Sequence, residues 1–142
     1  MSGLILAIED NLVQQKLYRL LCARFRFDCI VVDNTAEACT ILRSGRKKPS
    51  IILIDWILEN ESGLAALAPL KEIMNHQAYR IPIIAITANA FDSDRIACLA
   101  AGADDYLAKP FTIAQFRNMI TQWTTCAEHQ QGQLSAQLHP EG

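Results

Sequence analysis

The chain has 142 residues, 51% of them hydrophobic and 20% charged, which is typical of a single globular domain with a full core. Its formal net charge of −2 offers no basic face, so we expect this domain to contact neither nucleic acid nor a membrane. The longest apolar runs, such as residues 51–54 and 81–86, are too short to cross a bilayer and no signal peptide opens the chain, which together predict a cytoplasmic location.

Strands and helices are predicted to alternate from the first residues onward. Residues 4–8 are apolar throughout, as in a strand that is covered on both faces. A helix should follow, with an apolar face formed by Leu12, Leu17, Leu20, Leu21 and Phe25. Residues 29–32 predict a second strand, and Asp33 or Asn34 can cap a short helix that runs to Leu42.

Two further strand–helix units are predicted in the middle of the chain. A strand over residues 51–54 ends in Asp55, and a loop through Gly63 then leads into a helix that runs to about Asn75. Residues 83–86 predict the fourth strand, and residues 93–101 predict the helix that follows it.

A fifth strand is predicted over residues 106–108. Thr112 and Gln115 form a capping box for the last helix. The apolar residues of that helix recur at helical spacing as Ile113, Phe116, Ile120 and Trp123. The polar residues 126–142 are typical of a linker or a disordered tail, so the folded domain is expected to span residues 1–125.

Five buried strands that alternate with helices predict an α/β fold with a parallel sheet and helices on both faces. Ligands of such sheets bind beyond the carboxyl ends of the strands. Four of the five strand ends carry polar residues, which are Glu9 with Asp10, then Asp55, Thr87 and Lys109. Because these ends share one edge of the sheet, the side chains are expected to converge.

The converging side chains favour phosphoryl chemistry. The carboxylates of Glu9, Asp10 and Asp55 repel one another unless a cation neutralises them, and Mg²⁺ prefers carboxylates together with waters and a phosphate oxygen. The hydroxyl of Thr87 and the ammonium of Lys109 can hold phosphoryl oxygens, and an aspartate can act as the nucleophile. Each residue alone has an ordinary role as a cap or a solvated side chain. Their placement at successive strand ends favours a phosphoacceptor site.

Two other classes of protein fit the pattern less well. A flavodoxin-like cofactor binder needs a loop rich in Ser, Thr or Gly after its first strand, where the carboxylates of Glu9 and Asp10 would repel a bare phosphate. A phosphatase with an aspartyl nucleophile needs a second Asp two residues further on, and that residue is Ile57.

The cysteines are odd in number and scattered along the chain, without a Cys-x-x-Cys pair. They are Cys22, Cys29, Cys39, Cys98 and Cys126. We therefore expect small apolar side chains in a reduced protein rather than metal ligands or disulfide partners.

Four motifs resemble those of the receiver domains of response regulators in two-component signalling. They are residues 8–11, Ile54-Asp55 with Gly63, residues 86–90 and residues 101–111. The resemblance extends from residue 4 to about residue 124. It implies a flavodoxin-like, doubly wound, five-stranded parallel sheet in the order 2-1-3-4-5 with five helices.

The resemblance also implies an acceptor and a metal site. Asp55 would be the phosphoacceptor and would receive its phosphoryl group from a phosphohistidine. Mg²⁺, or Mn²⁺ in its place, would be bound by Asp10, Asp55 and the backbone carbonyl of Ile57, with Glu9 acting through a metal-bound water.

The remaining family roles fall on the fourth and fifth strand ends. By the resemblance, Thr87 and Lys109 would hold the phosphoryl oxygens. Tyr106 matches an aromatic switch residue whose rotamer follows Thr87, and Lys109–Pro110 matches a peptide bond that is usually cis.

The finer sequence resembles receivers attached to hybrid sensor histidine kinases, notably in Asp10-Asn11, residues 87–90 and residues 94–106. This implies a sensor histidine kinase or a histidine phosphotransfer domain as partner. The alternatives are a stand-alone response regulator, a phosphate shuttle, or a receiver that serves mainly in protein interaction. In each case the only expected activities are the domain's own phosphorylation and slow dephosphorylation.

The chain departs from the family pattern just after the acceptor. Leu58 and Glu59 stand where an apolar residue and a proline are usual, which frees the backbone and adds a negative charge near the metal site. Ile57 and Asn89 occupy positions that influence hydrolysis of the phosphate. An apolar Ile57 is expected to make attack by water less efficient than a polar residue there.

Overall fold

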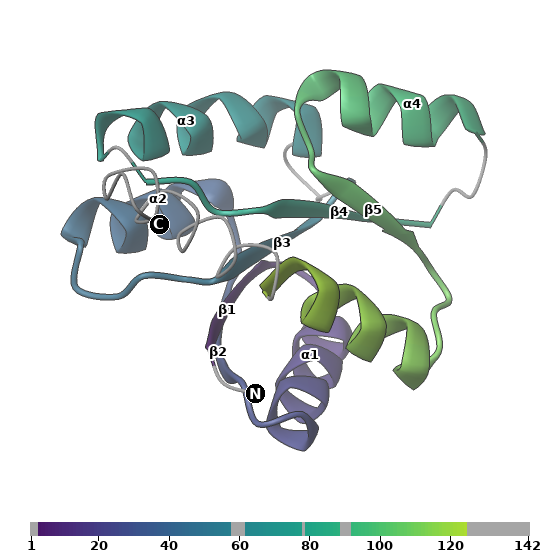
Figure 1. Ribbon diagram of the computed structural model, residues 1–142. Coiled ribbons are helices and arrows are strands. Elements are labelled where there is room, and N and C mark those ends of the chain that lie inside the picture. The colour runs from purple at the N-terminus through teal and green to yellow at the C-terminus, as the bar shows by residue number, and fades with distance from the viewer. Residues whose placement is uncertain (1–2, 58–61, 78, 89–91, 125–142) are drawn as a thin grey trace, which may run out of the picture.

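A computed structural model of the chain describes residues 3–57, 62–77, 79–88 and 92–124. Within these ranges one parallel sheet has the strand order β2-β1-β3-β4-β5 (Figure 1). The strands are β1 (Leu4–Ile8), β2 (Asp28–Val32), β3 (Ile51–Asp55), β4 (Ile83–Thr87) and β5 (Asp105–Ala108). The helices are α1 (Leu12–Arg24), α2 (Thr35–Ser44), α3 (Gly63–His76), α4 (Asp92–Ala101) and a final helix over residues 113–124, which Figure 1 leaves unlabelled. The predicted flavodoxin-like, doubly wound fold is confirmed.

Helices cover both faces of the sheet. One face packs against α1 and the final helix, through a buried cluster that includes Ile5, Tyr18 and Phe116. The other face packs against α2 and α3, through a cluster that includes Ile52 and Leu70 (Figure 1). Because successive strand residues alternate between these two clusters, both faces need apolar side chains, which explains the uninterrupted apolar runs.

The strands are aligned so that their carboxyl ends reach one edge together. Ile8 pairs with Val32 on one side and with Ile54 on the other. Further along the sheet, Asp55 pairs with Ile86, and Thr87 pairs with Ala108. The residues that follow β1, β3 and β5 are therefore neighbours in space.

Local capping signals set several helix ends. Asn34 rather than Asp33 caps α2, accepting a hydrogen bond from the backbone N–H of Glu37 at 2.9 Å. The predicted capping box of the final helix is confirmed, since Thr112 and Gln115 each accept a hydrogen bond from the other's backbone N–H at 3.0 and 2.8 Å.

The buried face of α1 differs from the prediction. Its buried residues are Gln15, Tyr18, Leu21 and Cys22. By contrast, Leu12 and Leu20 are 71% and 70% exposed. Helical spacing of leucines alone was misleading here, because Gln15 takes a buried position in which its amide nitrogen donates two hydrogen bonds.

No helix within the described ranges is both long enough and apolar enough to span a bilayer. The predicted tail at residues 126–142 lies outside the described residues, as do Leu58, Glu59 and Asn89.

Candidate functional site

An open cleft with a volume of about 580 Å³ lies at the carboxyl edge of the sheet. It is lined by Glu9, Asp10, Asn11, Gln14, Asp55, Ile57 and Lys109. These residues follow β1, end or follow β3, lie at the start of α1, or follow β5. The parallel sheet thus brings together five residues that the sequence singled out, namely Glu9, Asp10, Asp55, Ile57 and Lys109.

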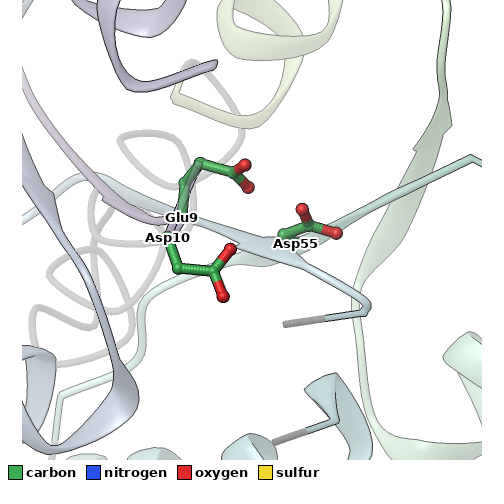
Figure 2. Close-up of side chains that lie close together, drawn as sticks. All are labelled: Glu9, Asp10 and Asp55. Carbon is green, nitrogen blue, oxygen red and sulfur yellow. The ribbon is translucent and has the colours of Figure 1, made fainter. Parts of the chain in front are cut away.

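Three carboxyl groups meet in this cleft. Carboxylate oxygens of Glu9, Asp10 and Asp55 all lie within 4.8 Å of one another (Figure 2). Glu9 is 0% exposed, and neither of its carboxylate oxygens has a hydrogen-bond donor among the described residues. A buried carboxylate without a donor is costly unless a cation or a proton neutralises it. An all-oxygen donor set of this kind fits a hard divalent cation such as Mg²⁺.

The Glu9 carboxyl group responds to this environment by holding its proton more tightly. Burial, and then the neighbouring carboxylate of Asp55, raise the pKa of Glu9 from 4.5 to about 8. The ammonium group of Lys109 opposes this rise. Binding of a divalent cation in the cleft would therefore compete with a proton.

We expect the stability of the metal-free protein to fall as the pH rises from about 4.5 to about 8. In this window the folded chain keeps a proton on Glu9 that the unfolded chain has lost, so ionisation of Glu9 disfavours folding. Added Mg²⁺ should therefore raise the melting temperature more at about pH 9 than at about pH 6. Thermal melts with Mg²⁺ or with a chelator measure this difference. In Glu9→Gln, the rise in melting temperature caused by Mg²⁺ should no longer depend on pH. An equal rise at both pH values in the parent chain would contradict this prediction.

Asp55, the last residue of β3, has a hydrogen-bond donor for each carboxylate oxygen. The backbone N–H of Ile57 donates to Oδ1 at 3.1 Å. The ammonium of Lys109 lies 3.2 Å from Oδ2, and the two side chains are 12% (Asp55) and 20% (Lys109) exposed. The Asp55 carboxylate is therefore held in a defined pose at the mouth of the cleft.

Lys109 reaches Asp55 from the end of β5. Its backbone N–H donates to the carbonyl of Thr87 at 2.7 Å, which extends the pairing of β4 with β5 by one step. The Lys109–Pro110 peptide bond is cis. Lys109 thus belongs to the same edge of the sheet as the acidic cluster.

Thr87 and Tyr106 are not among the described lining residues of the cleft. Thr87 ends β4 and is 1% exposed. Tyr106 is half-buried on β5 and packs against a small cluster of Ala85, Cys98 and Ala103. Their expected phosphoryl-binding and switch roles remain predictions.

Close packing against Trp56, the residue after Asp55, explains why position 63 is a glycine. Its backbone N–H donates to the carbonyl of Trp56 at 2.8 Å. A Cβ atom at Gly63 would lie 3.0 Å from the Cα of Trp56, closer than ordinary van der Waals contact. A residue with a side chain would therefore push α3 away from the end of β3.

Three polar residues of the site were missed from the sequence. Asn11 and Gln14 line the cleft, and Asn11 also caps α1 by accepting from the N–H of Gln14 at 3.1 Å. Gln15 donates to the backbone carbonyl of Glu9 and to Oδ1 of Asp33, both at 2.6 Å. Gln15 thus ties the end of β1 to the turn before α2. A polar residue one helical turn after the cap was the only signal for it in the sequence.

Residues 5–121 match the response regulator receiver domain family. The chain is 32% identical to the phosphate regulon transcriptional regulatory protein PhoB of Pseudomonas aeruginosa, over 76% of this chain and 45% of PhoB. It is 34% identical to hybrid signal transduction histidine kinase I of Dictyostelium discoideum, over 75% of this chain and 6% of the kinase. The chain therefore spans less than half of these two relatives. The DivK polar-differentiation response regulator of Brucella anthropi is 31% identical, over 84% of this chain and 94% of DivK.

Solved structures have the same architecture. The receiver domain of the sensor histidine kinase PA1611 from Pseudomonas aeruginosa, with a magnesium ion in its active-site cleft, superimposes with a TM-score of 0.75 at 33% identity. The match covers 88% of this chain and 99% of that one. The Ssk1 receiver domain of Saccharomyces cerevisiae, crystallised with the histidine phosphotransfer protein Ypd1, shares the fold with a TM-score of 0.78 at 23% identity, over 87% of this chain and 90% of the matched chain.

Proposed function

The chain belongs to the response regulator receiver domain family, and on that premise we propose that Asp55 accepts a phosphoryl group from a phosphohistidine in a Mg²⁺-dependent phosphorelay. The observation that carries this proposal is the position of the Asp55 carboxylate, between the ammonium of Lys109 and the carboxyl groups of Glu9 and Asp10. That arrangement provides a nucleophile, a fixed cation and an oxygen-rich cation site within one cleft.

The acidic residues of the cleft would hold the metal ion. Asp10 and Asp55 would bind Mg²⁺ through carboxylate oxygens, together with the backbone carbonyl of Ile57, while Glu9 would act through a bound water. The bound ion would neutralise negative charge on the phosphoryl oxygens during transfer. Support comes from the unsatisfied carboxylate of Glu9 and from the magnesium ion in the PA1611 receiver.

Phosphoryl transfer then needs little more than positioning and neutralisation of charge. A carboxylate oxygen of Asp55 bonds to phosphorus while the P–N bond breaks, and its electron pair returns to the imidazole of the donor. Lys109, already in contact with Asp55, would pair with one phosphoryl oxygen and the hydroxyl of Thr87 would donate to another. Tyr106 would change rotamer with Thr87 and so shift the population of the activated state.

For the wider setting, we propose a cytoplasmic receiver over residues 1–125 within a hybrid histidine kinase, which passes its phosphoryl group to a histidine phosphotransfer domain. Similarity to hybrid kinase I supports this setting, and the Ypd1–Ssk1 crystal provides a precedent for such a pair. A stand-alone response regulator or shuttle is the second candidate. It is favoured by DivK, almost all of which is matched by this chain.

Transfer from radiolabelled phosphotransfer domains tests the proposal. We expect label to move from the donor histidine to this chain when Mg²⁺ is present, and to stay on the donor when Asp55→Asn or a chelator is used. Equal labelling of the Asp55→Asn variant would overturn the assignment of the acceptor. Labelling by acetyl phosphate without transfer from any of a panel of donors would overturn the relay setting alone.

An apolar strip on α1 is the surface we assign to the phosphotransfer partner. Val13, Leu17 and Leu20 share one face of the helix, and they are 74%, 36% and 70% exposed. Leu12 is also exposed, and it directly follows Asn11 in the sequence. Asn11 lines the cleft. Contiguous exposed apolar side chains beside a reaction site favour a protein contact.

We expect Leu20→Glu to slow transfer from the phosphotransfer domain about tenfold or more, as for a residue at the centre of an interface. Phosphorylation by acetyl phosphate should be unchanged, because this small donor needs no contact with α1. The matched control is Ile96→Glu on α4, which replaces another exposed apolar side chain. Quench-flow measurements with both donors compare the variants, and equal slowing in both variants would contradict the assignment.

Ile57 should protect the aspartyl phosphate. This side chain lines the cleft and is 63% exposed, so it can exclude water beside Asp55 without offering a polar atom. We expect Ile57→Asn to shorten the phosphate lifetime by up to about tenfold, less than the full effect of a placed acid–base group. Ile57→Val serves as the apolar control. Loss of phosphate from Ile57→Asn at the parental rate would remove the basis for this role.

A further inference from the structure

Cys22 and Cys29 lie seven residues apart in the sequence and pack in the same cluster between α1 and β2. Cys22 is fully buried on α1, and Cys29 is half-buried on β2. Alternation along β2 turns Cys29 and Val31 toward the face of the sheet that α1 covers, and both pack against the apolar cluster that contains Cys22. The side chain of each cysteine is also the largest influence on the pKa of the other thiol. Packing in one cluster and this mutual influence place the two thiols together between α1 and β2.

The surroundings give these two thiols different reactivity. The neighbouring Cys22 side chain lowers the pKa of Cys29, and the charge of Arg19 acts in the same direction against the effect of burial. The neighbouring Cys29 side chain, together with burial, raises the pKa of Cys22. Because β2 is an edge strand, the half-buried Cys29 is the thiol that a small oxidant can approach.

We propose that Cys22 and Cys29 form a peroxide-sensitive dithiol site that closes to an intramolecular disulfide. The Cys29 thiolate attacks one oxygen of a hydroperoxide, the O–O bond breaks, and a sulfenic acid forms on Cys29 while the leaving oxygen departs as water or alcohol. The sulfur of Cys22 then attacks that of Cys29. The S–O bond breaks, and the hydroxide leaves as water with the thiol proton of Cys22. Two electrons pass from the two thiols to the peroxide.

The site is distinct from the acceptor cleft and from the other described cysteines. Cys39 packs in the cluster on the opposite face of the sheet, and Cys98 packs against Ala85 and Ala103. Burial raises the pKa of the Cys98 thiol, so this residue is the natural reference for an unreactive cysteine. Closure of the disulfide would tie the carboxyl-terminal half of α1 to the edge strand.

Peptide mapping after treatment with hydrogen peroxide tests the proposal. Arg24 and Arg26 lie between the two cysteines, so trypsin releases Cys22 and Cys29 on separate peptides unless a disulfide joins them. The expected result is one linked pair of peptides, an intact mass lower by two hydrogen atoms, and reversal by dithiothreitol. Cys29 should lose alkylation by iodoacetamide at least about tenfold faster than Cys98.

Variants separate the two steps. Cys22→Ser should stop the reaction at a sulfenic acid on Cys29 that dimedone traps, whereas Cys98→Ser should form the disulfide like the parent chain. Oxidation of Cys29 no faster than that of Cys98 would overturn the proposal. So would a peroxide-induced disulfide that joins two chains, or one that joins Cys29 to Cys39.

Discussion

Replacing Asp10 with Asn is expected to weaken Mg²⁺ binding by more than about a hundredfold. This loss should exceed that from mutating a residue that only hydrogen-bonds to a metal ligand. The amide keeps the shape of the side chain but removes one of the three carboxyl groups whose oxygens lie within 4.8 Å of one another. Glu9 can hold a proton near neutral pH, so Asp55 alone would then offer a full charge to the ion. Isothermal titration calorimetry with MgCl₂ measures the change.

Phosphorylation of the Asp10→Asn variant by acetyl phosphate should fall along with its Mg²⁺ affinity, and partial activity should return at high Mg²⁺ concentration. Asp28→Asn is the matched control, because Asp28 is an exposed carboxylate at the start of β2. A parental Mg²⁺ affinity in Asp10→Asn would exclude Asp10 as a ligand of the ion.

Replacing Lys109 with Gln should slow phosphorylation without weakening Mg²⁺ binding, unlike Asp10→Asn. We expect the rate of phosphorylation to fall by about a hundredfold to a thousandfold, which is the usual cost of removing one charge-stabilising donor from a reaction site. Mg²⁺ affinity should stay the same or rise. The reason is that the Lys109 ammonium, 3.2 Å from Oδ2 of Asp55, competes with the ion for that carboxylate.

Lys47→Gln, in the exposed turn before β3, controls for the loss of one positive charge. Stopped-flow phosphorylation and calorimetry on the same samples separate the two quantities. A parallel loss of Mg²⁺ affinity and phosphorylation in Lys109→Gln would show that Lys109 supports the shape of the cleft instead of the incoming phosphoryl group.

The sheet and the core of the site could be predicted because they depend on rules that act locally or on whole strands. Uninterrupted apolar runs required a sheet covered on both faces, and parallel strands then placed Asp10, Asp55 and Lys109 at one edge. Capping by Asn34 and by Thr112 with Gln115 depends on residues within a few positions of each helix start.

The orientation of α1 could not be predicted in the same way. Leucines lie on more than one side of this helix, so helical periodicity does not decide which side is buried. The structure buries Gln15 and exposes Leu20, because the amide of Gln15 finds acceptors on Glu9 and Asp33 in the folded chain. The burial of a polar residue that is stabilised by tertiary hydrogen bonds cannot be predicted from the spacing of apolar residues.

Tertiary contacts also set the ionisation of side chains. The raised pKa of Glu9 depends on its complete burial and on the approach of Asp55 from another strand. The meeting of Cys22 and Cys29 depends on how α1 packs across β2. Spacing along the chain reports neither effect, and for that reason the sequence predicted only small apolar side chains at the cysteines.

Incubation with acetyl phosphate and Mg²⁺, followed by intact mass and peptide mapping, tests the central claim most directly. The account requires a gain of one phosphoryl group, located on the peptide that contains Asp55 and lost when a chelator is present. The Asp55→Asn variant should gain none. A phosphoryl group on any other residue, or an unchanged gain in Asp55→Asn, would contradict the assignment of Asp55 as the acceptor.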